Sequence, residues 1–287
     1  MTNRQRLQAF LQSEATGGAL LIGADGIHSA IRHQMAPEEG EPRWNGAMLW
    51  RGTTLAKPFK SGASMVMVGH SGLRFVSYPI SRTDPRSGLA TINWIANLQF
   101  DPDGRFNKED WNREARLADF LPDFEAMKFD WLDVPSLVRS SERVYEYPMV
   151  DRDPLVRWTQ GRVSLMGDAA HAAYPVGSNG AGSAIIDARK LGRAFLDHGV
   201  EPQALSAYED EMRPVTSKVI LTNRVAGPDQ ILDVVEERCG GRFVSIDEVI
   251  SQDELAAHAD RYKAIAGYAI AATNEAPSTI PQGSRIA

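Results

Sequence analysis

Apolar positions along the chain gather in short segments whose spacing separates predicted strands from predicted helices. Residues 19–22 and 163–166 are compact apolar runs that lead directly into glycine-containing turns, which is the pattern of buried strands. Between residues 48 and 97, segments rich in β-branched and aromatic side chains alternate with clusters of Gly, Pro, Ser and Asp, as in an antiparallel sheet. We predict its strands at residues 49–54, 65–68, 73–80 and 89–98, with strand character resuming at 144–149.

Apolar residues at helical spacing predict helices in three other regions. These regions are residues 109–120, 184–196 and 203–237. Pro122 is expected to stop or kink the first helix, and Pro214 and Gly227-Pro228 are expected to interrupt the third region. The tail at residues 274–287 is rich in Pro, Ser, Gly and Thr, so we expect it to be poorly ordered.

Composition and charge exclude several classes of function. The 287 residues, 43% hydrophobic and 24% charged, suit one large or two small globular domains. A net charge of −6 argues against a nucleic acid or an anionic membrane as partner. Cys239 is the single cysteine, so no intrachain disulfide or cysteine-based metal site is expected. The chain lacks a signal-peptide pattern and an apolar run of roughly 18 residues, and we predict a cytoplasmic location.

The turn at Gly23 to Ser29 follows the first apolar run. Glycines at the carboxyl end of a strand let backbone approach a ligand closely, and an ionised Asp25 can bind sugar hydroxyls or order nearby N–H groups. An ordinary Asp-Gly turn between strand and helix is the alternative.

A longer glycine-rich pattern follows the second apolar run, from Gly167 through Gly182. The strand delivers Asp168 to the sheet edge, where its carboxylate can bind a ribose hydroxyl. A helix predicted to start near residues 180–183 would favour negative charge on a ligand before its amino terminus. The alternative is a glycine-rich turn that precedes a core helix.

Both turns resemble motifs of the class A flavoprotein monooxygenases. Gly23 to Arg32 resembles their Asp-Gly motif and Gly167 to Asp187 resembles their Gly-Asp motif with its flavin-facing loop. The resemblance covers roughly residues 20–225 and is nearest to the branch of salicylate-hydroxylase-like and phenazine-carboxylate monooxygenase-like enzymes. Other similar segments are Met48–Gly52, Tyr78–Ser81, Asn93-Trp94, Asp110–Arg113 and Tyr147–Leu155.

The resemblance implies an α/β fold, with a partial Rossmann-like FAD-binding domain interleaved with an antiparallel β-sheet substrate domain and a helical C-terminal part. The implied boundaries are a partial FAD-binding domain at 1–40, the substrate-binding sheet at 41–153, the continued FAD-binding domain at 154–225, and a helical segment and tail at 226–287.

The same resemblance implies roles for individual residues. Asp168 would contact the FAD ribose, Asp25 and Gly26 would help hold the pyrophosphate region, and Pro175 would flank the isoalloxazine ring. The implied cofactor-binding residues are Asp25, Gly26, Arg32, Gly167, Asp168, Pro175, Gly177, Asn179, Gly180, Ala181 and Gly182, and the implied catalytic residues are Arg51, Tyr174 and Pro175.

The chemistry that the resemblance implies is hydroxylation of an aromatic or N-heteroaromatic acid. NADH or NADPH would reduce FAD, O2 would add at flavin C4a, and the hydroperoxide would transfer one hydroxyl group to the ring. The protein's tasks would then be to position the ring, exclude water and stabilise charge. The six histidines lack the close helical spacing of zinc ligands, so no metal is expected.

Three side chains near these motifs have alternative interpretations. Arg51 could contact the flavin or a substrate carboxylate, or lie on the solvated face of the sheet. For His171, a structural role is favoured over a role as a catalytic base. Tyr174 could be part of a pocket wall or a core residue.

One family motif is missing from the sequence. A complete member opens with a strand, a Gly-x-Gly-x-x-Gly turn and a helix that neutralises the pyrophosphate, and no glycine triplet here has that spacing. We therefore expect a truncated product, an internal start, or a chain that completes its site through a partner or a homo-oligomer. The alternative to an active enzyme is a non-catalytic fragment that acts only as a folding or interaction module.

Overall fold

The computed structural model describes residues 20–101, 113–225, 227, 229–266 and 278–285. Within this part, the chain divides into two compact units. The motif unit comprises the described residues within 1–43, 150–228 and 253–287, and the sheet unit comprises the described residues within 44–149 and 229–252. The domain boundaries expected from the sequence, at residues 40, 153 and 225, stay predictions.

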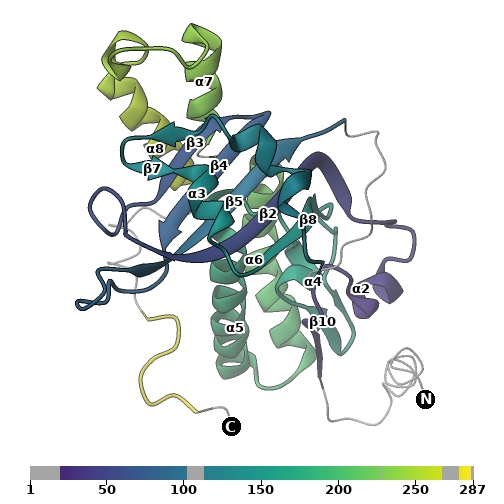
Figure 1. The fold of residues 1–287 in the computed structure, drawn as a ribbon. Coiled ribbons are helices and arrows are strands. Elements are labelled where there is room, and N and C mark those ends of the chain that lie inside the picture. The colour runs from purple at the N-terminus through teal and green to yellow at the C-terminus, as the bar shows by residue number, and fades with distance from the viewer. Residues whose placement is uncertain (1–19, 102–112, 226, 228, 267–277, 286–287) are drawn as a thin grey trace. The chain divides into compact units, whose positions relative to one another are not determined.

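The motif unit is built on a short parallel strand pair covered by helices (Figure 1). Strands β1 (Leu21–Gly23) and β10 (Val163–Leu165) are parallel, and β9 (Thr159–Gln160) pairs antiparallel with β10. The helices are α2 (Ala30–Met35), α4 (Asp168–His171), α5 (Asn179–His198), α6 (Pro202–Val225) and α8 (Gln252–Ala266), with the 3-10 turn η3 (Val176–Ser178) before α5. The long helices α5 and α6 lie side by side and bury a core that includes Trp158, Leu165 and Tyr208.

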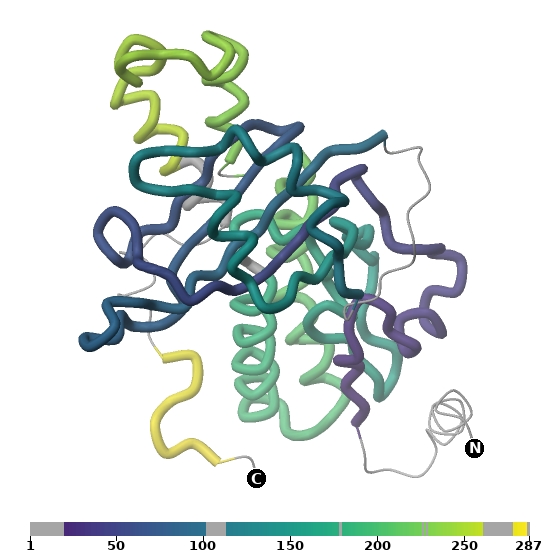
Figure 2. Tube along the Cα trace, in the orientation of Figure 1, coloured from purple at the N-terminus to yellow at the C-terminus, as the bar shows by residue number. Residues whose placement is uncertain are grey.

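The sheet unit contains a five-stranded sheet in the order β3-β4-β5-β2-β8. The path of the chain can be followed by its colour in Figure 2. Its strands are β2 (Arg43–Ala56), β3 (Val66–His70), β4 (Leu73–Pro79), β5 (Ala90–Gln99) and β8 (Val144–Asp151). Smaller elements are η1 (Leu117–Asp119), η2 (Leu121–Phe124), β6 (Lys128–Phe129), β7 (Leu132–Asp133), α3 (Val134–Arg139), α7 (Gln230–Cys239) and η4 (Ile246–Glu248). These bounds confirm the predicted strands and the α/β class.

One face of this sheet carries the aromatic core of the unit. Phe75, Ile92 and Trp94 are fully buried there, and Trp50 stacks on Phe120 at a ring-centroid distance of 4.8 Å. Because side chains alternate between the faces of a strand, the residues between these core positions point to the opposite face.

The predicted helix at residues 109–120 is wrong for the described residues 113–120. Ala115 N–H donates to Val144 O and Glu146 N–H donates to Arg113 O, so this segment pairs with β8, and residues 117–119 form only a 3-10 turn. The long-range pairing outweighs the local apolar periodicity. Residues 109–112 lie outside the described part of the chain.

Pro214 does not interrupt the chain as predicted but lies inside α6. A proline removes the hydrogen bond to the carbonyl four residues earlier, which here belongs to Asp210. Both Pro214 and Asp210 are exposed, so water can bind that carbonyl. The buried stripe Tyr208, Met212, Thr216 and Val219 continues on the other side and keeps the helix in place. The predicted break after α6 is confirmed, since α6 ends at Val225 and α7 begins at Gln230.

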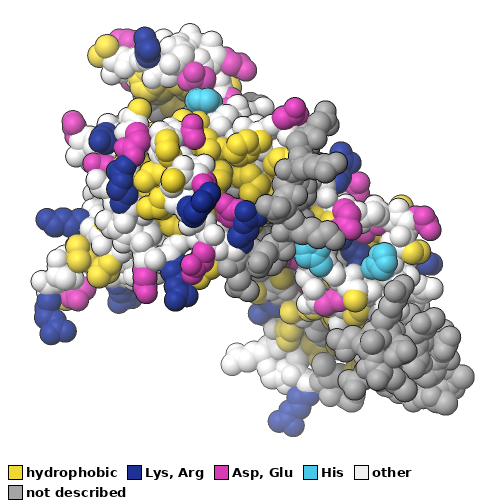
Figure 3. All heavy atoms as spheres, turned by 45° about the vertical axis from the view of Figure 1, so that its right-hand side comes forward, with side chains coloured by type: hydrophobic (Ala, Val, Ile, Leu, Met, Phe, Trp, Pro, Cys, Tyr) yellow, Lys and Arg dark blue, Asp and Glu magenta, His cyan; other side chains and the backbone are white. Residues whose placement is uncertain are grey.

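Basic and acidic side chains are interspersed on the face displayed in Figure 3. Among the described residues, no helix is long and apolar enough to cross a membrane. In the same part of the chain, no three His, Cys, Asp or Glu side chains are grouped as metal ligands would be.

Candidate functional site

The two motif turns follow neighbouring parallel strands in the motif unit. Register pairs Gly23 with Leu165, and Met166 N–H donates to Gly23 O at 2.8 Å. The Asp-Gly turn and the Gly-Asp turn therefore leave the same edge of the sheet. Carboxyl ends of parallel strands are where ligands bind in α/β folds.

Asp25 orders the first turn. Its carboxylate accepts hydrogen bonds from Ser29 Oγ at 2.5 Å and from Ala30 N at 2.8 Å. Ser29 Oγ in turn accepts from Arg32 N at 2.9 Å and caps α2. Gly26 has φ 81°, and a Cβ added there would meet no heavy atom within 4 Å. Asp25 thus fixes a turn whose glycine has open space beside it.

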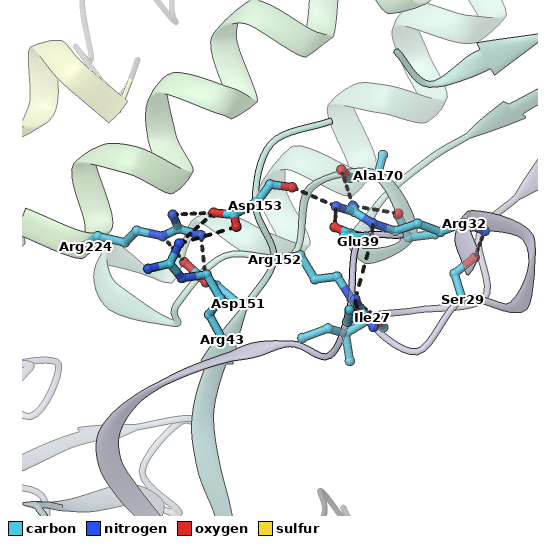
Figure 4. A network of polar contacts seen from close by, with 12 residues as sticks. Ile27, Ser29, Arg32, Glu39, Arg43, Asp151, Arg152, Asp153, Ala170 and Arg224 are labelled. Atoms are coloured by element: carbon cyan, nitrogen blue, oxygen red, sulfur yellow. Dashed lines mark hydrogen bonds and ion pairs between the residues drawn. The ribbon is translucent and has the colours of Figure 1, made fainter. Parts of the chain in front are cut away.

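Arg32 lies at the centre of a buried polar network (Figure 4). Its guanidinium donates to the carbonyl oxygens of Ala169, Ala170 and Asp153 at 3.1, 2.8 and 2.7 Å, and it pairs with both oxygens of Glu39. These contacts use all five N–H groups of an arginine, and Arg32 is only 1% exposed. Arg32 therefore connects the two motif turns, and its guanidinium N–H groups are all used within the protein.

Gly167 and Asp168 form the second turn. Gly167 has φ 60°, a region that favours glycine, and Asp168 is exposed at the first turn of α4. Gly167 N–H donates to Asp187 Oδ2 of α5 at 2.9 Å, and His171 Nε2 contacts the same oxygen at 2.6 Å. Asp187 and His171 are both buried. These contacts join the turn to α5, and His171 has a structural role in them.

The loop from Tyr174 to Gly182 leads into α5. Asn223 Nδ2 of α6 donates to the carbonyls of Tyr174 and Val176 at 3.2 and 3.1 Å, which fixes the loop from the far side. Gly177 has φ 75°, and no heavy atom lies within 4 Å of a Cβ added at Gly180. Residues 179–182 form the first turn of α5, whose early N–H groups have no partner within the helix. Ala181 is exposed and Gly182 is half-buried.

Tyr174 and Pro175 differ in their surroundings. Pro175 is exposed, whereas Tyr174 is buried and its hydroxyl donates to Arg43 O at 3.4 Å. Burial, and then the carboxylate of Asp151, raises the pKa of Tyr174 to about 12. Tyr174 is therefore protonated near neutral pH and cannot act as a base there.

The segment Asp151-Arg152-Asp153 connects the surrounding elements (Figure 4). Arg224 of α6 donates to both oxygens of the fully buried Asp151, at 2.7 and 2.9 Å, and to Asp153. Arg152 donates to the carbonyls of Ile27 and Gly40 at 2.8 and 2.7 Å. One short segment thus holds the loop after β1 and the end of α6.

Arg51 belongs to the sheet unit. It is exposed, and its Nε donates to Asn93 Oδ1 at 3.0 Å. The side chain lies on the face opposite the aromatic core, because Arg51 alternates with Trp50 and Gly52 along β2.

Sequence reasoning missed the side chains that hold these turns. These side chains are Asp187, Asn223, Arg224 and Glu39. The first three act on segments at least 20 residues away in the sequence, and Glu39 lies in the irregular segment after α2, seven residues from its partner Arg32. A polar residue inside an otherwise apolar helical stripe, such as Asp187 or Asn223, is the one pattern that could have indicated them.

A family model described as an FAD binding domain matches residues 4–222. Phenazine 1,6-dicarboxylic acid hydroxylase PhzS of Lysobacter antibioticus is 39% identical over 229 residues, which cover 77% of this chain and 56% of that protein. Salicylate hydroxylase of Pseudomonas putida is 30% identical over 224 residues, covering 72% of this chain and 51% of that protein. The chain thus spans about half the length of these curated relatives.

Solved structures share the fold. Klebsiella pneumoniae HpxO, complexed with FAD and uric acid, superposes with a TM-score of 0.63 at 21% identity, over 88% of this chain and 60% of that one. A salicylate hydroxylase substrate complex gives a TM-score of 0.62 at 23% identity, over 92% of this chain and 65% of that one. The extent of the family match and the identity to PhzS show that this chain belongs to the FAD-binding-domain family of class A aromatic monooxygenases.

Proposed function

We propose that this chain acts as an FAD-dependent monooxygenase that hydroxylates an aromatic or N-heteroaromatic acid, with NADH or NADPH as reductant and O2 as co-substrate. The observation that carries the proposal is the adjacency of the Asp-Gly and Gly-Asp turns at the carboxyl ends of β1 and β10. Two similar proteins are named for salicylate and for phenazine 1,6-dicarboxylic acid, which supports an acidic aromatic substrate.

The described residues of the motif unit fit a flavin dinucleotide. Gly26 and Gly180 leave open space where a side chain would otherwise project, as expected where a ligand approaches backbone. Asp168 is exposed beside the sheet edge and would bind the ribose. The N–H groups at residues 180–182 would face the pyrimidine edge of the ring, and Pro175 would flank it.

Bound FAD would supply electron transfer from the nicotinamide cofactor and activation of O2. The chain's own side chains would bind and orient the substrate. Arg51 would attract its carboxylate. Tyr174, protonated near neutral pH, would act as a neutral wall or hydrogen-bond donor rather than as a base.

Flavin binding tests the proposal directly. We expect the purified chain to take up FAD with a flavin absorption band and quenched flavin fluorescence, and we expect Asp168→Ala to weaken that binding. Asp197→Ala, an exposed substitution on α5, is the matched control. A chain that stays colourless and does not bind added FAD would support the non-catalytic fragment instead, and unchanged affinity in Asp168→Ala would remove the role of that carboxylate.

The edge of β1 that faces away from β10 suggests how flavin binding would be completed. Among the described residues, β1 has only β10 as a strand neighbour. We propose that a partner polypeptide adds a strand, a Gly-x-Gly-x-x-Gly turn and a helix at this edge, because such a helix neutralises a pyrophosphate. Mixing the chain with a polypeptide of that design should raise FAD affinity roughly tenfold or more. Equal affinity with and without it would argue against this use of the edge.

A further inference from the structure

Asp187 of α5 uses only one of its two carboxylate oxygens in the contacts that hold the Gly-Asp turn. Its Oδ2 accepts from Gly167 N at 2.9 Å and contacts His171 Nε2 at 2.6 Å. Its Oδ1 is buried and has no hydrogen-bond partner among the described residues. Both oxygens of a carboxylate can accept hydrogen bonds, and a buried acceptor without a partner is unfavourable. A donor beside Oδ1 would therefore stabilise this carboxylate.

Tyr208 of α6 has the complementary group. Its side chain is 1% exposed, and its hydroxyl is likewise buried without a hydrogen-bond partner in the described part of the chain. Burial raises the pKa of this hydroxyl, and the negative charge of Asp187 is the next cause. The hydroxyl therefore lies near the carboxylate and keeps its proton near neutral pH. A donor and an acceptor that both lack a partner thus share one part of the core.

Buried aromatic rings surround this part of the core. The ring of Trp158 lies 5.5 Å from the ring of His171 and 5.9 Å from that of Tyr208, and Trp158 is 1% exposed. Asp187 itself is fully buried. Because the surroundings are apolar, a hydrogen bond to the charge of Asp187 is electrostatically stronger here than it would be in water.

The residue after Tyr208 fixes the strand that precedes the turn. Glu209 Oε2 accepts from Thr159 N at 2.8 Å. Thr159 belongs to β9, which pairs with β10. Consecutive residues of α6 therefore contact β9 and lie beside Asp187, so Tyr208 is placed by a helix that is fixed to the strands, as a supporting side chain for a binding turn requires.

We propose that Tyr208 is a positioning residue for the Gly-Asp turn, whose hydroxyl donates to Asp187 Oδ1 and thereby directs Oδ2 at Gly167 N. The terminal torsion of an aspartate is broad, so a carboxylate held at one oxygen can rotate away from its partners. Gly167 immediately precedes Asp168, so the direction of Oδ2 determines where the Asp168 carboxylate stands. The inference rests on the proposed function for the binding of FAD at this turn.

Hydrogen exchange with mass spectrometry on the full chain tests the positioning without FAD. Tyr208→Phe removes the hydroxyl and keeps the ring. Amides in peptides from residues 163–171 should then exchange about threefold faster or more, because Gly167 N–H opens more often. Peptides from α7, in the sheet unit, should exchange at the wild-type rate.

Thr216→Val is the matched control on the same helix. Thr216 is buried, and its hydroxyl donates to Met212 O at 3.0 Å and to Arg213 O at 3.4 Å, both within α6. Its removal should leave exchange at residues 163–171 unchanged. Urea denaturation of both variants measures global stability, since a tyrosine that only fills the core would lower that stability without accelerating exchange at the turn.

A second substitution shows whether Tyr208 acts through Asp187. In the Asp187→Asn background, Tyr208→Phe should accelerate exchange at residues 163–171 less than it does in the wild-type background, because a neutral amide is a weaker acceptor than a carboxylate. FAD titration then measures the consequence for binding. Tyr208→Phe should weaken FAD about tenfold, as expected for the loss of one hydrogen bond to a charged group, and Thr216→Val should not.

Several results would overturn the inference. They are unchanged exchange at residues 163–171 in Tyr208→Phe, an equal increase in Thr216→Val, an undiminished increase in the Asp187→Asn background, and faster exchange with unchanged FAD affinity. If Tyr208→Phe does not fold, Tyr208→Met replaces it, since a methionine adapts to irregular gaps in a core.

Failure of the proposed function gives a different result. A chain that binds no FAD but exchanges faster at the turn in Tyr208→Phe contradicts the proposed function and supports positioning by Tyr208. A chain that binds FAD and exchanges at the wild-type rate in Tyr208→Phe supports the proposed function and overturns the positioning role.

Discussion

Asp187 is a single residue on which the geometry of the Gly-Asp turn depends. Its Oδ2 binds Gly167 N and His171 Nε2, and the side chain is fully buried. Asp187→Ala would leave both groups without that acceptor inside the protein. Since buried polar groups without partners cost about 1–3 kcal/mol each, we expect the free energy of unfolding to fall by about 2–4 kcal/mol in urea denaturation.

Asp197→Ala on the same helix is the control for that substitution. Asp197 pairs with Arg193 on the surface, where solvent screens the pair, so no measurable change is expected. A loss in Asp187→Ala no larger than that of Asp197→Ala would show that the turn does not rely on this contact.

Ionisation of Tyr174 should make the stability of the fold depend on pH in the alkaline range. Its pKa is raised from 10.0 to about 12, mainly by burial and next by Asp151. The unfolded chain therefore loses this proton at a lower pH than the folded protein does. The resulting stability is whole below pH 10.0 and is lost as pH rises toward about 12.

We expect the wild-type protein to lose stability more steeply than Tyr174→Phe between pH 10 and about 12. Urea denaturation at several pH values in that interval measures both slopes. Comparison with the phenylalanine variant removes the contributions of Tyr147 and Tyr208, whose pKa values are also raised by burial. Parallel slopes would mean that Tyr174 has the same pKa in the folded and the unfolded protein.

At the scale of elements, the sequence predicts what neighbouring residues determine. Strands β2 to β5 and β10, the break after Val225 and both glycine turns were predictable because alternation and glycine punctuation are local signals. The segment at 113–120 was not, since pairing with β8 decides its conformation. The predicted interruption at Pro214 was wrong for a similar reason, because the buried apolar stripe of α6 stabilises the helix more than one lost hydrogen bond destabilises it.

The candidate site divides in the same way. Asp25, Asp168 and the glycines could be found from the sequence, as their positions follow from strand and turn. The buried role of Arg32 could not, because its partners Ala169 and Asp153 lie more than a hundred residues away. Asn93 belongs to this second group, since its partner Arg51 lies on another strand.

The ion pair between Arg224 and Asp151 joins α6 to the end of β8, and substitutions at both residues measure how much it stabilises the fold. Arg224→Met would leave the buried carboxylate of Asp151 without its cation, and breaking a buried pair costs about 3–5 kcal/mol. Adding Asp151→Asn removes the stranded charge, so the double variant should lose less than the sum of the two single variants, by about 1–3 kcal/mol.

Urea denaturation of the four proteins in this cycle gives the coupling between the two side chains. Arg193→Met, which breaks an exposed pair on α5, is the matched control and should change little. Additive losses in the cycle would show that Arg224 and Asp151 stabilise the fold independently.

At the scale of the whole molecule, FAD binding should stabilise the motif unit and leave part of the sheet unit unchanged. A ligand that binds the folded state at about 100 times its dissociation constant adds about 2.7 kcal/mol of stability. In the proposed function, FAD contacts the turns after β1 and β10, which belong to the motif unit, whereas α7 and η4 at residues 229–252 belong to the sheet unit.

Hydrogen exchange with mass spectrometry can follow both regions in one experiment. We expect added FAD to slow exchange in peptides from residues 23–32 and 166–182, because a ligand on these turns would reduce their local opening. Peptides from residues 230–248 are the internal control and should exchange at unchanged rates. Protection of the control peptides alone would place the flavin elsewhere, and protection of neither region would mean that the motif turns do not bind FAD in this chain.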